Sequence, residues 1–98
     1  MKVHEAFEHF IRQFTKAHEM EIIWMGTGFK ITIPFIGYWT YEFKDENTLE
    51  LHLVNQEVIT IKFVDFEWLW KKNRPLSFLF YLDNHMRDVL LIDLKSLV

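Results

Sequence analysis

The 98-residue sequence contains no cysteine, three glycines and two prolines. The absence of cysteine excludes disulfides and thiolate metal ligands, and it suits a reducing compartment. Three glycines are too few for a glycine-rich loop that cradles nucleotide phosphates. We therefore expect a cytoplasmic protein without a bound cofactor.

Long apolar runs are also missing from the chain. The stretch 76–82 is among the longest, and it is far shorter than the roughly 20 residues that a membrane-spanning helix needs. Residues 2–21 mix charged and apolar side chains, unlike a secretory signal peptide. The net charge of -3 gives no general attraction to nucleic acid. These features predict a soluble protein, and the length predicts one domain over residues 1–98.

What the sequence has in abundance is alternation of apolar and polar residues. In four successive segments the apolar positions are Phe29, Ile31 and Ile33; Trp39, Tyr41 and Phe43; Leu49, Leu51 and Leu53; and Ile59, Ile61 and Phe63. A period of two is typical of strands with one buried face and one solvated face. With residues 20–25 it predicts a five-stranded antiparallel meander at 20–25, 29–33, 38–44, 48–54 and 57–64. Residues 55–56 are the predicted two-residue turn before the fifth strand.

Residues 2–19 show a different period. Val3, Phe7, Phe10 and Phe14 recur at helical spacing, and charged side chains occupy the opposite side. This pattern predicts an amphipathic helix that packs on the sheet.

The C-terminal third is ambiguous. Asp65 is suited to N-cap a short helix through Lys72, with Glu67 in its first turn. Pro75 favours a helix over residues 76–82, whereas the aromatic residues there favour a strand paired with residues 89–94, and we prefer the strand hairpin. The predicted fold class is α+β: an N-terminal amphipathic helix packed on an antiparallel meander of five or more strands, with a C-terminal hairpin or helix.

The pattern of titratable residues predicts neither an enzyme nor a metal site. No serine or threonine lies in a strand-to-helix elbow or a phosphate-binding loop. Side chains on the polar sheet face could gather, and a histidine beside a glutamate there could act as a base, but alternating charges also fit cross-strand pairs. These candidates are Glu42, Lys44, Glu50, His52 and Lys62.

The histidines of the helix are the candidate metal ligands. His4 and Glu8 are four residues apart, a spacing that places two ligands on one helix face, but His9 lies about 140° from His4. A solvated charged face is the simpler interpretation, and we expect no metal.

The strongest functional hypothesis is a protein-binding module without catalytic activity, such as an inhibitor, adaptor or regulatory subunit. Apolar side chains at the tip of a hairpin are costly to leave in water unless they fold back onto the core or meet a partner. Aromatic residues also supply most interface hot spots. The candidate protein-binding residues are Phe35, Ile36, Tyr38 and Trp39.

The alternative hypothesis is a small single-stranded nucleic-acid-binding protein. Aromatic side chains beside cations can stack bases and contact phosphates. The candidates are Trp68, Trp70, Lys71, Lys72 and Arg74, although core tryptophans followed by a solvated basic helix end explain them more simply. With 17% aromatic residues, a homodimer formed through a sheet edge or the C-terminal segment is a further possibility.

Overall fold

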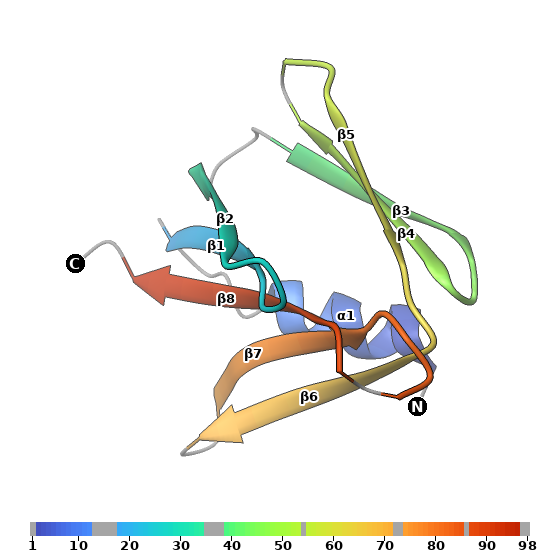
Figure 1. The fold of residues 1–98 in the computed structure, drawn as a ribbon. Helices are drawn as coiled ribbons and strands as arrows, with labels where there is room; N and C mark the ends of the chain where they lie inside the picture. Colours follow the sequence, from blue (N-terminus) through green and yellow to red (C-terminus); the bar gives the residue numbers. More distant parts are fainter. Residues whose placement is uncertain are drawn as a thin grey trace.

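The computed structural model describes residues 2–12, 18–34, 39–53, 55–71, 74–85 and 87–96. These residues form one helix and eight strands (Figure 1), so the fold is broadly α+β, as predicted. The elements are α1 (Val3–Arg12), β1 (His18–Trp24), β2 (Phe29–Pro34), β3 (Trp39–Asp45), β4 (Thr48–Leu53), β5 (Val58–Lys62), β6 (Asp65–Lys71), β7 (Arg74–Tyr81) and β8 (Val89–Ser96). Within the described part of the chain, no helix has the length and apolar character needed to cross a bilayer.

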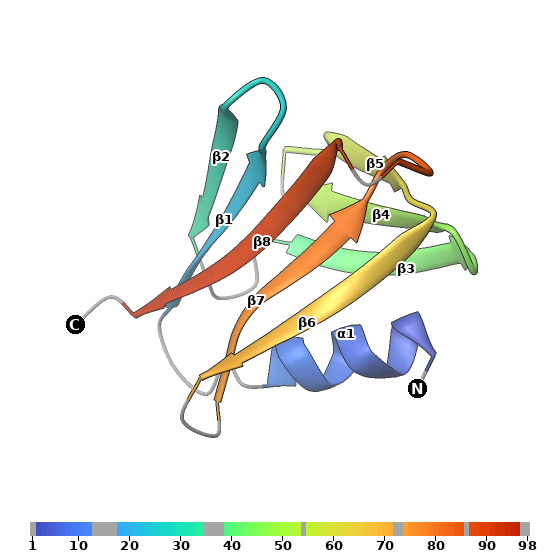
Figure 2. The ribbon, with the colours of Figure 1, turned by 60° about the horizontal axis from the view of Figure 1, so that its bottom comes forward.

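The strands form two antiparallel sheets. The five-stranded sheet has the order β2-β1-β8-β7-β6, and the three-stranded sheet has the order β3-β4-β5. The predicted five-stranded meander is therefore found only in part, because β1 and β2 belong to one sheet and β3 to β5 to the other. The break falls between β2 and β3, which lie in different sheets, and β1 pairs on its other side with the distant strand β8 (Figure 2).

A continuous stretch of chain joins the two sheets where β5 leads into β6. The Phe63 amide donates to the Asn47 carbonyl at 2.9 Å, in the turn of the three-stranded sheet. The next amide, that of Val64, donates to the Tyr81 carbonyl at 2.8 Å, in the five-stranded sheet. Adjacent residues thus bond to different sheets, and we call residues 63 and 64 the corner. Corners of this kind, where a strand switches sheets, are typical of orthogonal sheet packing.

The core lies between the inner faces of the two sheets and is completed by α1. Phe7 is fully buried, and its ring centroid lies 5.1 Å from that of Tyr41 on β3 and 5.2 Å from that of Phe78 on β7. The helix therefore contacts both sheets with one aromatic side chain. The inner face of the five-stranded sheet follows the strand register, and one row across it is Ile31, Ile22, Ile92, Phe78 and Trp68.

The predicted helix over residues 2–19 is too long. α1 ends at Arg12, and residues 18 and 19 belong to β1, while residues 13–17 lie outside the described residues. His18 and Glu19 are in register with Ser96 and Lys95 on β8, so pairing in the sheet outweighs helical periodicity there.

The predicted helix over residues 65–72 is wrong, because residues 65–71 form β6. The Asp65 carboxylate accepts the amide of the adjacent Phe66 at 2.8 Å, whereas a helix N-cap accepts an amide two or three residues on. Phe66 and Trp68 instead alternate with Asp65 and Glu67, and the strand buries the aromatic side against the core. The preferred strand interpretation of 76–82 and 89–94 agrees with β7 and β8, which are central to the five-stranded sheet rather than an added pair.

The β4–β5 loop differs from the predicted two-residue turn at 55–56. The Leu53 amide donates to the Glu57 carbonyl at 2.9 Å, and the Gln56 amide donates to the Leu53 carbonyl at 3.0 Å, so residues 54–56 separate the closing pair. Gln56 has φ of 70°, in the left-handed region. Three-residue hairpin loops commonly place glycine at such a position.

Replacing Gln56 with glycine is expected to stabilise the protein by about 0.5–1 kcal/mol, because a side chain in the left-handed region costs about 1–2 kcal/mol, partly offset by the flexibility of glycine when unfolded. Urea unfolding of Gln56→Gly, followed by tryptophan fluorescence, measures the change. Gln56→Ala is the control and should bring no gain. A lower unfolding midpoint for the glycine variant would contradict the expected strain.

Candidate functional site

The predicted protein-binding tip falls mostly outside the described residues, which include neither Phe35, Ile36 nor Tyr38. Trp39 is described, as the first residue of β3. Its ring is half-buried, lies 6.1 Å from the ring of Tyr41 and packs against the core. Trp39 is therefore engaged in part by the core.

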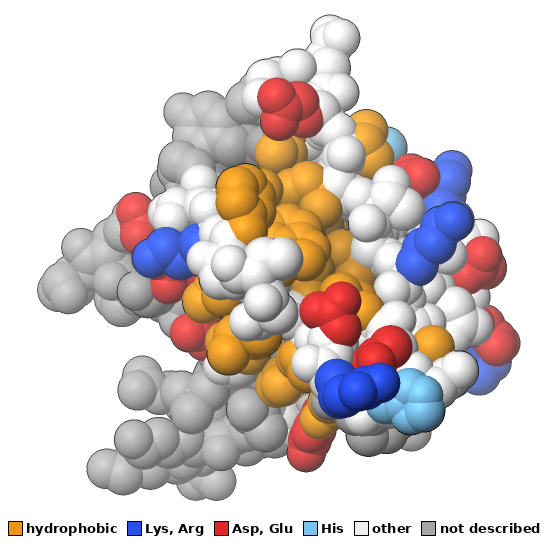
Figure 3. Space-filling view, viewed as in Figure 1, with side chains coloured by type: hydrophobic (Ala, Val, Ile, Leu, Met, Phe, Trp, Pro, Cys, Tyr) orange, Lys and Arg blue, Asp and Glu red, His pale blue; other side chains and the backbone are white. Residues whose placement is uncertain are grey.

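An exposed apolar surface lies instead on the β1–β2 hairpin. Phe29 is 59% exposed and Met25 is 56% exposed, and the Trp24 ring lies 5.6 Å from the Phe29 ring. Trp24 and Ile31 are partly buried beside them. Figure 3 shows hydrophobic side chains gathered on this side of the molecule, between the β1–β2 hairpin and β5. We call Trp24, Phe29 and Ile31 the hairpin surface.

Phe29 is exposed because of its place in the sheet. It is in register with Trp24, which is in register with Leu90, so all three continue one inner-face row. β2 is an edge strand, and no described strand lies beyond it (Figure 2). The alternation predicted burial for Phe29, and no sequence signal could have corrected this, because exposure depends on which strand forms the edge.

The β7–β8 loop borders the hairpin surface. The Met25 amide donates to the Val89 carbonyl at 2.9 Å, linking the end of β1 to the start of β8. The Asp83 carboxylate accepts the amides of Arg87 at 2.9 Å and Asp88 at 3.1 Å. These bonds, that from Asp88 foremost, hold the pKa of Asp83 below its ordinary value of 3.8. The ionised carboxylate thus holds this loop in place at neutral pH.

The aromatic and basic segment has one well-placed side chain, that of Trp68. Its ring lies 6.4 Å from the buried ring of Phe78 and stacks with His9 of α1 at 6.0 Å. Lys71 and Arg74 are in register at the end of the β6–β7 hairpin, and Trp70 is in register with Pro75. The side chains of these residues and the whole of Lys72 lie outside the described part. The ring of Trp68 therefore already packs against side chains of the protein itself.

Acidic groups lie on the solvated face of the same hairpin. The Tyr81 hydroxyl donates to Glu67 Oε2 at 2.6 Å, and this hydrogen bond is the main reason that the pKa of Tyr81 lies above its ordinary value. A carboxylate at this position repels phosphate and gives no support to the nucleic-acid hypothesis.

Four of the five polar residues predicted to gather do so on the three-stranded sheet. Lys44 Nζ lies 3.6 Å from Glu42 Oε2 and 3.9 Å from Glu50 Oε1, and His52 Nε2 lies 3.2 Å from Glu50 Oε1. The fifth, Lys62, is in register with Thr48. Two of these charge contacts lie within one strand and the third crosses from β3 to β4, so Lys44 lies between Glu42 and Glu50, which are directly opposite in the register.

The same cluster is the group best suited to hold a metal among the described residues. Glu42, Glu50 and His52 each offer a ligand atom, and these atoms lie within 4.8 Å of one another. Zinc accepts two carboxylates and an imidazole, but a cation here would have to displace the Lys44 ammonium.

The helix does not bring His4 and Glu8 together. His4 Nε2 lies 4.0 Å from Glu5 Oε1, while Glu8 Oε1 accepts Arg12 Nη2 at 2.6 Å. Burial, followed by the negative charge of Glu8, raises the pKa of Tyr41 beneath the helix. Glu8 thus has a cation partner four residues along the same helix.

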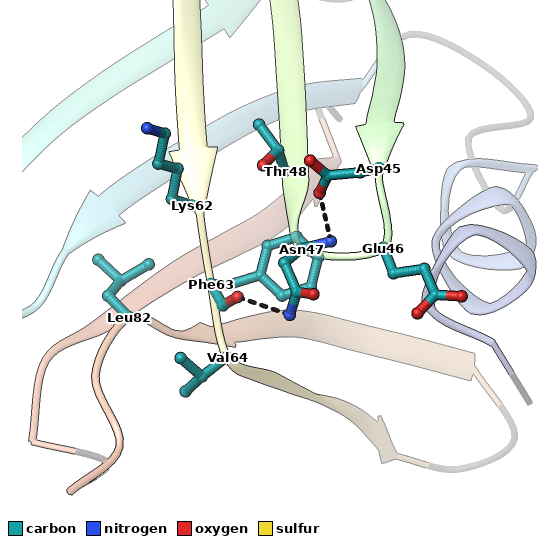
Figure 4. Close-up of a pocket in the computed structure, with 8 residues that line it drawn as sticks. All are labelled: Asp45, Glu46, Asn47, Thr48, Lys62, Phe63, Val64 and Leu82. Atoms are coloured by element: carbon teal, nitrogen blue, oxygen red, sulfur yellow. Dashed lines mark hydrogen bonds between the residues drawn. The ribbon is translucent and has the colours of Figure 1, made fainter.

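The surface is hollowed on both sides of the β3–β4 turn. Asn47 lies at the centre: its side-chain amide donates to the Phe63 carbonyl at 3.0 Å, and its own amide donates to Asp45 Oδ1 at 2.8 Å (Figure 4). The larger hollow, of about 770 Å³, extends towards the start of α1. Its aromatic residues are Phe43, Phe63 and Phe66, and its charged and histidine residues are Lys2, His4, Asp45, Glu46 and Asp65. The mixture of both charge signs selects no single ligand chemistry.

In comparisons with known proteins, no family model, no curated protein and no solved structure matched this chain.

Proposed function

We propose that this chain is a protein-binding module without catalytic activity and that it binds through the hairpin surface and the free edge of β2. The observation that carries the proposal is the 59% exposure of Phe29 on an inner-face row in which Trp24 is partly buried and Leu90 is fully buried. Large exposed aromatic side chains on a small domain are typical of interaction surfaces.

The edge of β2 supports a polypeptide as the bound molecule. An edge strand presents unpaired amide and carbonyl groups, which a second extended chain can satisfy by adding a strand to the sheet. Phe29 and Ile31 supply apolar contacts at alternate positions on the inner side, while Ile33 is already buried in the core. A partner with its own alternating apolar residues is therefore the chemistry that this surface fits.

The polar groups give less support to an enzyme. The histidine and carboxylates of the three-stranded sheet already pair with one another and with Lys44 on an open, solvated face. Trp68, the described aromatic residue of the nucleic-acid hypothesis, packs against Phe78 and His9. Neither cluster offers the unoccupied aromatic surface that the hairpin does.

The test compares Phe29→Ser with Val58→Ser in affinity capture from a lysate of the native host. Val58 is 48% exposed on β5 and lies outside the hairpin surface, so its replacement is a matched loss of exposed apolar area. We expect Phe29→Ser to lower the captured partner at least tenfold, as for an interface hot spot, and Val58→Ser to leave it unchanged. Circular dichroism checks that both variants fold. Equal capture by both variants would contradict the proposal.

A further inference from the structure

We propose that the partner at the β2 edge is a second copy of this chain, added antiparallel about a two-fold axis at Ile31, so that the two five-stranded sheets become one continuous sheet. This inference rests on the proposed function and names its partner. Three features of the molecule support a second copy as the occupant: the register of β2, the charges along its edge and the exposure of Phe29.

The alternation of β2 restricts the possible registers of self-pairing. Side chains of the two copies share a face only when the two-fold axis passes through a residue, since an axis between residues would set apolar positions against polar ones. An axis at Lys30 would face two lysines, and an axis at Thr32 would set Lys30 against Pro34, which has no amide to donate. The axis at Ile31 avoids both faults.

The pairs formed about Ile31 are complementary. Ile31 faces Ile31 of the second copy, Phe29 faces Ile33, and Lys30 faces Thr32, so apolar meets apolar and no like charges are opposed. An interface of this kind is isologous, as expected for a closed dimer. Phe29, the most exposed large apolar side chain among the described residues, gains a neighbouring strand in both copies at once, opposite Ile33, whose own side chain is 4% exposed.

The charges along the edge favour β2 over the opposite edge of the same sheet. Lysine on an edge strand usually hinders pairing, but Lys30 Nζ lies 3.1 Å from Glu21 Oε2 on the neighbouring strand, whose side chain is 7% exposed. The opposite edge strand, β6, carries Asp65 and Glu67 and is flanked by α1, whose His9 stacks on Trp68. β2 is thus the less hindered edge for a second strand.

The test introduces a positive or a negative charge at Thr32, an exposed position on the edge. In Thr32→Lys the new lysine faces Lys30 of the second copy at two symmetry-related places, and the dimer dissociation constant should rise about fivefold. In Thr32→Glu the new carboxylate faces Lys30 twice, and the dissociation constant should fall by a similar factor. Sedimentation equilibrium over a series of protein concentrations measures both.

The two variants are expected to change the stability of the monomer in the direction opposite to their effect on dimer stability. The two effects can therefore be told apart. Thr32 is in register with Glu21 of its own chain, so lysine there should stabilise the monomer and glutamate should destabilise it. If lysine at position 32 weakens the dimer and glutamate strengthens it, the cause therefore cannot be a change in the folding stability of the monomer. The unfolding midpoint of each variant is measured alongside.

Two results would overturn the inference: a monomer at every concentration up to the millimolar range, or dissociation constants that shift in the same direction for both Thr32 variants. If the protein is a monomer but Phe29→Ser still loses a captured protein, self-pairing is wrong and the proposed function stands. If Phe29→Ser changes neither capture nor association, both are wrong.

Discussion

Phe7→Ala is expected to lower the free energy of unfolding by about 4 kcal/mol, the largest loss among the changes considered for this protein. Phe7 is fully buried, and its ring lies within 6.1 Å of the rings of Phe10, Tyr41, Phe43, Phe78 and Phe80. Its removal leaves a cavity where the helix meets both sheets, and the surrounding aromatic rings can collapse into it only partly.

Urea unfolding measured by fluorescence and by circular dichroism gives the change in free energy. Glu8→Ala is the matched control, since Glu8 is the next residue of α1 and is exposed, and loss of its ion pair with Arg12 should cost less than about 0.5 kcal/mol. Phe7→Leu, which leaves a smaller cavity, serves if the alanine variant does not fold. A cost for Phe7→Ala close to that of the control would show that α1 does not hold the two sheets together.

Asn47→Ala is expected to cost about 1–2 kcal/mol, because it leaves the Phe63 carbonyl at the corner without its side-chain donor. The Asn47 amide still donates to Asp45 Oδ1 in this variant, so the β3–β4 turn keeps its own bond. The loss should therefore report the tie between the turn and the corner. Thermal unfolding followed by near-ultraviolet circular dichroism measures it.

Asn55→Ala is the control for Asn47→Ala. Asn55 Oδ1 accepts the Glu57 amide at 3.0 Å, a bond confined to one exposed loop, and its loss should cost about 0.5 kcal/mol. Equal costs for the two asparagine variants would mean that the contact across the corner adds nothing to a local turn bond.

The sequence contains one signal for the corner, which is a shift in the phase of the alternation. Ile61 and Phe63 face the core at odd positions, whereas Phe66 and Trp68 do so at even positions. The change of phase falls at residues 64 and 65, where the strand passes from one sheet to the other, and it also distinguishes β6 from a helix. The change of phase is easily overlooked, because Asp65 is also suited to cap a helix. In the folded protein, strand pairing outweighs this local capping preference.

The division into two sheets could not be predicted in the same way. The division falls between β2 and β3, and both strands alternate as well for pairing with each other as for lying in separate sheets. Alternation specifies which face of a strand is buried but not which strand lies beside it. Phe29 is exposed because, in the described part of the chain, β2 has no neighbouring strand on one side. The hairpin surface could therefore be identified only from the order of strands in the sheet.

The pairing of β8 with β1 also bears on the time course of folding. Residues 89–96 are synthesised after every other strand, yet they fill the position between β1 and β7 at the centre of the sheet. Until they leave the ribosome, the β1–β2 hairpin has no neighbour on its second side and exposes two edges. Contacts between such distant segments slow folding and expose incomplete chains to aggregation, so we expect closure of this sheet to be a late and slow step of folding.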